Sequence, residues 1–160
     1  MSSTILISGG TLPDGKKSDL LIKDGKIAEI STRIESDGAR VIDASKSVLL
    51  PGLVDLHTHL REPGKEDAET VESGSQAGVK GGFTALSAMA NTSPVADTAG
   101  VVEQVYRLGQ SAGLLDVFPI GAVTRGLEGE HLAEIGAMAD SVARVRVFSD
   151  DGHCVFDPLV

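Results

Sequence analysis

The stretch LVDLHTHLREPG, residues 53–64, decides the fold class and locates the candidate site. Its aliphatic start is typical of a buried strand of a parallel sheet. Because side chains two residues apart lie on the same face of a strand, His57, His59 and Arg61 are predicted to share one face. The stretch therefore predicts a strand that carries two imidazoles and a guanidinium group toward one place.

Further aliphatic stretches follow at similar intervals and alternate with helical patterns. The predicted strands cover residues 53–60, 83–90, 114–123 and 144–151, and the predicted helices cover residues 68–79, 98–110 and 130–139. A repeat of roughly 30 residues per strand and helix is typical of parallel strands joined by right-handed crossovers. An open doubly wound sheet and a (β/α)8 barrel both fit this repeat. No glycine-rich dinucleotide fingerprint follows any of the strands, which favours the barrel.

Residues 1–52 follow a different pattern, with short strands joined by tight turns. Asp24 and Gly25 lie between two alternating apolar runs and predict a two-residue hairpin turn. These strands form a small unit that needs further strands to close its core. A barrel takes about 250 residues, so residues 53–160 are predicted to be its first four strands, from a longer protein.

Composition excludes several classes of partner. The 23 acidic residues against 14 basic ones give a net charge of −9, and no basic cluster stands out, which argues against nucleic-acid and anionic-membrane partners. No apolar run approaches the ~20 residues of a membrane helix, and the first residues lack the pattern of a signal peptide. Cys154 is the single cysteine, so an internal disulfide is excluded and a cytoplasmic location is expected.

The two histidines of the first strand are candidate metal ligands. His57 and His59 lie about 7 Å apart along a strand, close enough to converge on one ion. A stable site needs a third ligand, which a carboxylate of the FSDDG segment could supply from the fourth strand; Asp150 and Asp151 alternate in direction, so only one of them can face the site. The alternatives are that the histidines are unrelated polar residues at a strand end and that Asp-Asp-Gly is only a turn.

Two further residues are candidates for binding an anionic substrate. The guanidinium group of Arg61 suits a carboxylate, although a surface ion pair with Glu62 would also explain it. Asn91 follows the second strand and could present its amide, although it also suits a helix-capping turn. His131 is expected to be solvated, and His153 and Cys154 are expected to be either loop residues or part of the mouth of the site.

Three motifs together resemble the dihydroorotases of the bacterial class I type, in the amidohydrolase superfamily. They are PGLVDLHTHLREPG, KGGFTALSAMANTSPV and FSDDG, and the resemblance covers essentially the whole chain. It implies that residues 1–52 are part of a small β-sandwich domain. Many amidohydrolases have a carboxylated lysine on the fourth strand, and RVRVFSDDG has no lysine, which fits this subclass. One departure is Ala90, where the family usually has proline.

The resemblance also implies roles for the candidate residues. His57, His59 and Asp151 match metal ligands, with Asp151 bridging two zinc ions, while Arg61 and Asn91 match residues that hold the substrate carboxylate, with His59 close to it. The implied reaction interconverts N-carbamoyl-L-aspartate and L-dihydroorotate in pyrimidine biosynthesis. Further ligands and the general acid/base aspartate are expected beyond Val160, so residues 1–160 alone are expected to be inactive.

The implied partners are a small-molecule substrate, the remainder of the barrel, further copies in a homo-oligomer, and aspartate carbamoyltransferase. Two alternatives stay open. One is a related cyclic amidase, such as a hydantoinase, dihydropyrimidinase or allantoinase, whose substrates lack the ring carboxylate. The other is a non-catalytic dihydroorotase-like subunit that only supports a partner; such proteins typically lack the first-strand histidines, which are present here.

Overall fold

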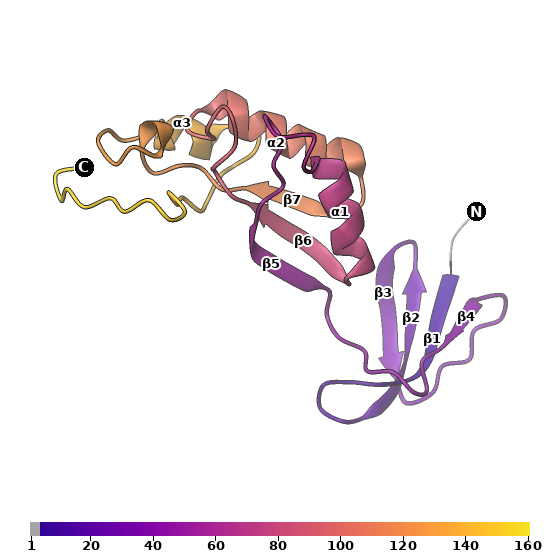
Figure 1. Cartoon of the computed structure of the whole chain (residues 1–160). Helices are drawn as coiled ribbons and strands as arrows, with labels where there is room; N and C mark the ends of the chain where they lie inside the picture. The colour runs from indigo at the N-terminus through magenta and orange to yellow at the C-terminus, as the bar shows by residue number, and fades with distance from the viewer. Residues whose placement is uncertain (1–3) are drawn as a thin grey trace. The chain divides into compact units, whose positions relative to one another are not determined.

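The computed structural model describes residues 4–160 and divides into two compact units, with the boundary between Pro51 and Gly52 (Figure 1). The first unit is a sheet of four strands. They are β1 (Thr4–Thr11), β2 (Lys17–Lys23), β3 (Lys26–Ser31) and β4 (Arg40–Asp43). Their order is β3-β2-β1-β4, with β1 antiparallel to β2, β2 antiparallel to β3, and β4 parallel to β1.

The predicted hairpin turn of the first unit is confirmed. Asp24 (φ 50°) and Gly25 (φ 73°) connect β2 to β3 and both have a positive φ, as a type I′ turn requires. The small core of the unit contains Leu6, Leu21 and Ile34. Several aliphatic side chains of the unit are exposed, among them Ile27, Ile30, Val41 and Val48.

The second unit contains the alternation of strands and helices that the repeat predicts. Its elements are β5 (Leu53–Thr58), α1 (Val71–Lys80), β6 (Phe83–Ala88), α2 (Ala99–Ala112), β7 (Asp116–Pro119), the short 3-10 helix η1 (Arg125–Leu127) and α3 (Ile135–Asp140). The three strands form a parallel sheet in the order β5-β6-β7. Helices α1 and α2 pack against each other and against β6 and β7 (Figure 1).

Local signals in the sequence define the ends of these helices. Thr70 caps α1, because its hydroxyl accepts the Ser73 N–H while the Ser73 hydroxyl accepts the Thr70 N–H. Helix α2 ends at Gly113, whose φ of 61° is the left-handed conformation that glycine favours. These helices cover one side of the sheet through buried residues that include Leu60, Val71, Leu86, Ala88, Val105 and Val117.

Part of the parallel sheet is exposed. Leu56 of β5 is 73% exposed and Phe118 of β7 is 51% exposed. Parallel sheets are usually covered on both faces, so β5 and β7 carry apolar surface that residues 4–160 do not bury. Within these residues, none of the helices has the length and apolar character that crossing a membrane requires.

The predicted fourth strand, residues 144–151, is not formed as a strand. Its pairing with the segment after β7 is a single parallel bridge between Gly121 and Phe148. The residues before Phe148 bond instead to the end of α3: the Val145 N–H donates to the Met138 carbonyl, and the Arg146 guanidinium donates to the Ala139 carbonyl. The Val145 N–H is therefore not available to a ladder with β7.

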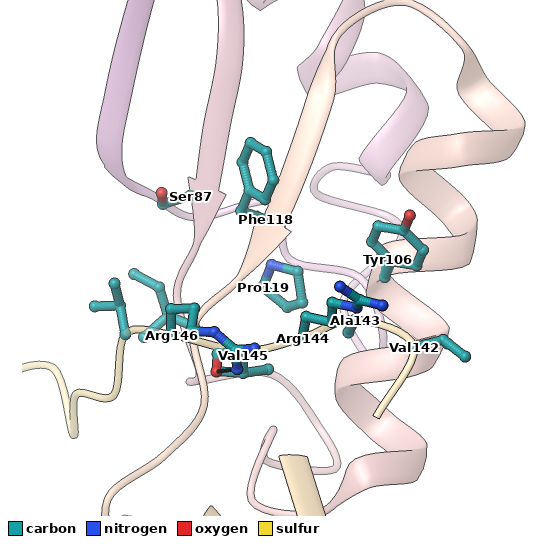
Figure 2. Close-up of a pocket in the computed structure, with 11 residues that line it drawn as sticks. Ser87, Tyr106, Phe118, Pro119, Val142, Ala143, Arg144, Val145 and Arg146 are labelled. Carbon is teal, nitrogen blue, oxygen red and sulfur yellow. Dashed lines mark hydrogen bonds between the residues drawn. The ribbon is translucent and has the colours of Figure 1, made fainter. Parts of the chain in front are cut away.

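A cavity of about 340 Å³ lies between β7 and this segment (Figure 2). Its lining includes Tyr106, Phe118, Val145 and Val147.

The third helix also differs from its prediction, because α3 begins at Ile135 rather than at residue 130. Residues just before it bond to another segment: Leu132 pairs with Thr124, and the Ala133 N–H donates to the Val123 carbonyl. A backbone held in this way cannot form the first turn of a helix.

Candidate metal centre

A β-bulge near the end of β5 sets the direction of His57. Asp55 pairs with Leu86 and Thr58 pairs with Ala88, so β5 has one extra residue between these two pairs. The His57 N–H donates to the Asp55 carboxylate at 3.0 Å instead of to the neighbouring strand. Bulges change the direction of side chains next to functional sites. The alternation expected from residue 57 to residue 61 does not hold, because β5 ends at Thr58 and Arg61 has a φ of 61°.

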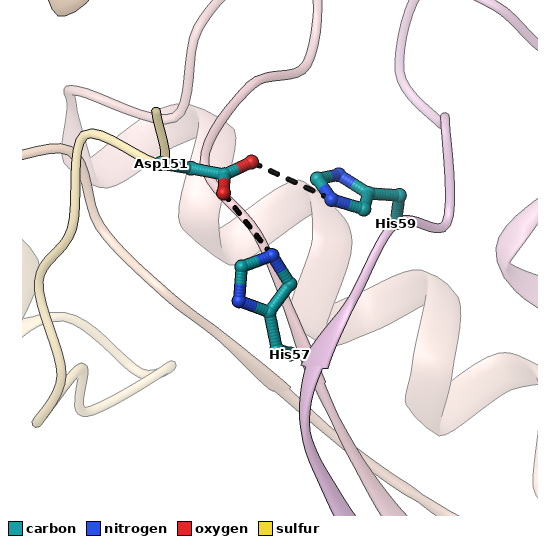
Figure 3. Close-up of side chains that lie close together, drawn as sticks. All are labelled: His57, His59 and Asp151. Atoms are coloured by element: carbon teal, nitrogen blue, oxygen red, sulfur yellow. Dashed lines mark ion pairs between the residues drawn. The ribbon is translucent and has the colours of Figure 1, made fainter. Parts of the chain in front are cut away.

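Three side chains nevertheless meet at this end of β5 (Figure 3). Nε2 of His57 lies 3.1 Å from Oδ1 of Asp151, and Nε2 of His59 lies 3.5 Å from Oδ2 of the same carboxylate. The two imidazole rings are 5.2 Å apart between centroids, at an interplanar angle of 64°. Ligand atoms of all three residues lie within 4.8 Å of one another, so the two predicted histidines and the predicted aspartate form one cluster.

Exposure differs across the cluster. The side chain of His57 is 57% exposed, that of His59 is 29% exposed and that of Asp151 is 14% exposed. The carboxylate is therefore shielded from water while the imidazole of His57 is open to it. A ligand can reach the cluster from the His57 side.

Asn91 connects two members of the cluster. Its Oδ1 lies 2.9 Å from Nδ1 of His59, and its Nδ2 donates to Oδ2 of Asp151 at 2.8 Å. An Nδ1–H on His59 would leave the lone pair of its Nε2 free to bind a metal. Asn91 follows β6, and a hydrogen bond from the Ala96 N–H to the Ala90 carbonyl closes the turn that contains it.

The two neighbouring aspartates have different environments. Asp150 is 5% exposed and its carboxylate accepts hydrogen bonds from Val123 and Thr124. Asp151 has a φ of 37° and its carboxylate lies between the two histidines. As the alternation of directions along the FSDDG segment suggested, only one of the two carboxylates lies in the cluster.

Arg61 lies in the loop between β5 and α1, outside the regular strand, with a φ of 61°. The ion pair with Glu62 that the sequence allowed is not formed; Glu62 accepts the Val71 N–H at the start of α1 at 2.7 Å. Over residues 4–160, no hydrogen bond or ion pair involves the Arg61 guanidinium. The structure thus brings His57, His59, Asn91 and Asp151 together, and Arg61 is not bonded to them.

The remaining candidates lie outside the cluster. His131, His153 and Cys154 are all exposed. The sequence did not predict the bulge or the hydrogen bond from the His57 N–H to the Asp55 carboxylate. The only signal for them was the aspartate two residues before His57. The sequence also did not predict the role of Thr124, a fully buried residue that bonds to Asp150.

The donor set fits a divalent metal ion. Two imidazoles and a carboxylate are ligands that such ions accept, and each offers an atom to the same small volume. These three residues leave coordination positions for further ligands or for water.

Comparison with known proteins finds a family model and curated relatives that match the chain. The family model described as dihydro-orotase-like matches residues 46–156. The dihydroorotase of Leifsonia xyli subsp. xyli is 64% identical over 157 residues, which is 98% of this chain and 36% of that protein. The dihydroorotase of Streptomyces coelicolor is 60% identical over 161 residues, which is 100% of this chain and 37% of that protein. The chain therefore spans little more than a third of the length of these relatives.

Solved structures show the fold to which the chain is similar. The L-hydantoinase (dihydropyrimidinase) of Arthrobacter aurescens matches with a TM-score of 0.67 and 26% identity, over 79% of this chain and 29% of that chain. A D-hydantoinase matches with a TM-score of 0.58 and 29% identity, over 78% of this chain and 28% of that chain. These neighbours are amidohydrolase barrel enzymes, in agreement with the mixed α/β fold.

Proposed function

The chain belongs to the dihydroorotase-like family, as its motifs suggested, and we propose that it carries the first part of the metal site of a dihydroorotase. The reaction is the interconversion of N-carbamoyl-L-aspartate and L-dihydroorotate in pyrimidine biosynthesis. The observation that carries this proposal is the meeting of His57, His59 and Asp151, which come from the first and last parts of the second unit. A cluster of these donors in a chain of this family supports a metal-dependent hydrolase.

Zinc is the proposed metal, with two ions in each active site. When bound, such ions supply Lewis-acid chemistry, because they lower the pKa of a water molecule and polarise a carbonyl group. The chain's own contribution is to place the donors: His57 and His59 provide Nε2 atoms, and the two oxygens of Asp151 lie toward different histidines. The match of its motif implies that Asp151 would be a ligand shared by the two ions.

Arg61 and Asn91 are the proposed partners of the substrate carboxylate, with His59 close to it. The free guanidinium of Arg61 has a planar pair of donors that matches a carboxylate. Asn91 uses one N–H on Asp151 and retains a second N–H that can donate to substrate. Together they would hold the ring in one orientation, which favours reaction at a single amide bond.

The fold proposed for the whole protein is a (β/α)8 barrel preceded by a small β-sandwich domain. Residues 1–52 supply strands of the sandwich, and residues 53–160 supply the first four strands of the barrel. The exposed apolar side chains of Leu56 and Phe118 support a sheet that continues beyond the residues described. The remaining ligands, and an aspartate that moves the proton, come from the later strands. A homo-oligomer and an association with aspartate carbamoyltransferase belong to the same proposal.

A related cyclic amidase is the second candidate function. It is favoured by the similarity in fold to a hydantoinase of Arthrobacter aurescens. Arg61 distinguishes the two functions, because the ring of a hydantoin or a dihydropyrimidine has no carboxylate for a guanidinium group to hold. A subunit without catalytic activity is the third candidate, and the retained pair His57 and His59 argues against it.

The experiment that tests the proposed function is a comparison of substrates with the full-length, metal-loaded protein. Turnover of dihydroorotate at least about 100-fold faster than that of hydantoin and dihydrouracil supports the proposal, since 100-fold corresponds to about 2.7 kcal/mol of transition-state binding. The reverse preference would assign the protein to the other cyclic amidases. Absence of turnover on every substrate, in a protein that retains no metal after the loading step, would favour the non-catalytic subunit.

A further inference from the structure

Asp150 is a buried carboxylate that the proposed reaction does not use. It is 5% exposed, and over residues 4–160 no lysine, arginine or histidine forms an ion pair with it. Burying an unpaired charge is unfavourable unless hydrogen-bond donors surround it. Its burial beside a cluster residue therefore requires a structural reason.

Three donors supply that compensation, and all come from one short segment. Oδ1 of Asp150 accepts the Val123 N–H at 2.7 Å and the Thr124 N–H at 3.1 Å, and Oδ2 accepts the Thr124 hydroxyl. Hydrogen bonds to an ionised carboxylate are stronger than neutral ones. The carboxylate of Asp150 thus fixes its own segment to residues 123–124.

Thr124 extends this network into the loop after β7. Its side chain is fully buried, and its hydroxyl accepts the Gly129 N–H at 3.0 Å while it donates to Asp150. The same loop is held from another direction, because the Asp97 carboxylate accepts the Gly126 N–H at 2.9 Å. The hydrogen-bond partners of Asp150 therefore belong to a loop that several hydrogen bonds hold in place.

Besides these bonds, the bonds of Val145 and Arg146 to the end of α3, and the bond from Asn91 to the Asp151 carboxylate, the segment that carries Asp151 has few attachments. It is not part of a strand, and its ladder contact is the single bridge between Phe148 and Gly121. Asp151 itself has a φ of 37°, a conformation that disfavours residues with a Cβ, and its N–H donates to the Ser149 hydroxyl at 3.1 Å. Such a conformation persists only where surrounding contacts impose it.

We propose that Asp150 is a positioning residue for the metal site: through Val123 and Thr124 it fixes the backbone that presents the carboxylate of Asp151 to His57 and His59. This inference rests on the proposed function, because it assigns Asp151 to the metal. Residues that orient metal ligands typically change metal affinity or activity about 10- to 100-fold when replaced. Asp150 acts on the site through its neighbour and does not contact the metal.

The test uses the full-length protein with Asp150→Asn, and with the pair Thr124→Val and Thr124→Ser. Zn²⁺ affinity is measured by competition with a chelator, the visible spectrum is recorded after loading with Co²⁺, and the melting temperature is recorded without metal. We expect Asp150→Asn and Thr124→Val to bind Zn²⁺ about 10- to 100-fold more weakly and to alter the Co²⁺ spectrum. Thr124→Ser keeps the hydroxyl and should restore both properties.

Exposed Asp140 provides the matched control, and Asp140→Asn should bind Zn²⁺ like the wild type. Wild-type affinity and spectrum in Asp150→Asn, whatever its melting temperature, would overturn the inference and leave the proposed function intact. If Asp150→Asn does not fold, the two Thr124 variants decide. Wild-type Zn²⁺ affinity in both Thr124→Val and Thr124→Ser would then overturn the inference. A wild-type protein that binds no metal would contradict the proposed function and this inference together.

Discussion

Asn91 lies between His59 and Asp151 and bonds to both, with its Oδ1 2.9 Å from Nδ1 of the histidine and its Nδ2 2.8 Å from Oδ2 of the aspartate. The side chain therefore links two residues of the cluster that come from different ends of the second unit. An amide in this position can orient two metal ligands and still offer an N–H to the substrate.

Replacement of Asn91 by alanine is expected to weaken metal binding as well as substrate binding. Loss of the amide frees the ring of His59 and removes one donor from Asp151, so Zn²⁺ affinity should fall about 10- to 100-fold. Chelator competition on the full-length protein measures this change, with Gln110→Ala on the exposed surface of α2 as the control. Unchanged Zn²⁺ affinity combined with a raised KM would show that Asn91 binds the substrate and does not orient the metal ligands.

Replacement of Arg61 by methionine should separate substrate binding from metal binding. Methionine retains much of the length of the side chain but cannot hold a carboxylate, so turnover of dihydroorotate should fall below detection while bound metal is unchanged. Steady-state kinetics and metal analysis of the same preparation check both statements. Arg107→Met, on the exposed side of α2, is the matched control. Full activity in Arg61→Met would remove Arg61 from the substrate site.

Gly64 should be required for the contact between the two loops that carry Arg61 and Asn91. Its φ is 103°, and a Cβ at this position would lie 2.2 Å from the carbonyl oxygen of Ser93, in a contact supported by the bond from the Ser93 N–H to the Pro63 carbonyl at 2.9 Å. Gly64→Ala should therefore lower the stability of the protein and raise the KM for dihydroorotate.

A substitution at Gly82 separates the backbone strain of a positive φ from the contact with Ser93. Its φ is 85° but a Cβ there would meet no atom within 4 Å, so Gly82→Ala should have only the backbone strain, about 1–2 kcal/mol. Thermal melting of both variants measures the difference. Equal melting temperatures would show that the contact with Ser93 contributes nothing.

Stability of the first unit should depend on the ionisation of Asp19. The N–H groups of Gly9 and Ile34 donate to this buried carboxylate and lower its pKa below the usual range. Because the folded pKa is lower than the unfolded value of about 4, the stabilisation is complete above that value and is lost as the pH falls through the folded pKa.

Hydrogen exchange provides the measurement for Asp19. The amides of Gly9 and Ile34 should be less protected in Asp19→Asn than in the wild type at pH 7, by about 1–3 kcal/mol of opening free energy. At a pH below the lowered pKa of Asp19, these two amides should be equally protected in the wild type and in Asp19→Asn. Asp37→Asn, at an exposed position, should match the wild type at both pH values. A difference between wild type and Asp19→Asn that persists at low pH would contradict the role of the charge.

Sequence patterns were sufficient for much of the fold because they act locally. The turn at Asp24 and Gly25, and the parallel strands β5, β6 and β7, follow from short-range chemistry and a regular repeat. The expected strand over residues 144–151 was wrong, because its alternating pattern does not reveal that Val145 and Arg146 bond to the end of α3. A competing tertiary contact of this kind has no signal in the local sequence.

The sequence predicted which residues come together better than it predicted their geometry. That His57, His59 and Asp151 bind metal stays a prediction, and Arg61 is not bonded to their cluster. Residue types and motif order identified His57, His59 and Asp151, which the structure brings together. The bulge at Asp55 and the network around Asp150 depend on pairing between distant segments, so a reading of strand alternation could not supply them.

Metal content of the full-length protein tests the central claim most directly. Metal analysis after dialysis should find close to two zinc ions per wild-type active site, reduced to about half an equivalent or less in His57→Ala and Asp151→Ala. His131→Ala, at an exposed histidine outside the cluster, should retain the wild-type content. A wild-type protein with less than about half an equivalent of zinc, or variants that hold as much zinc as the wild type, would contradict the account.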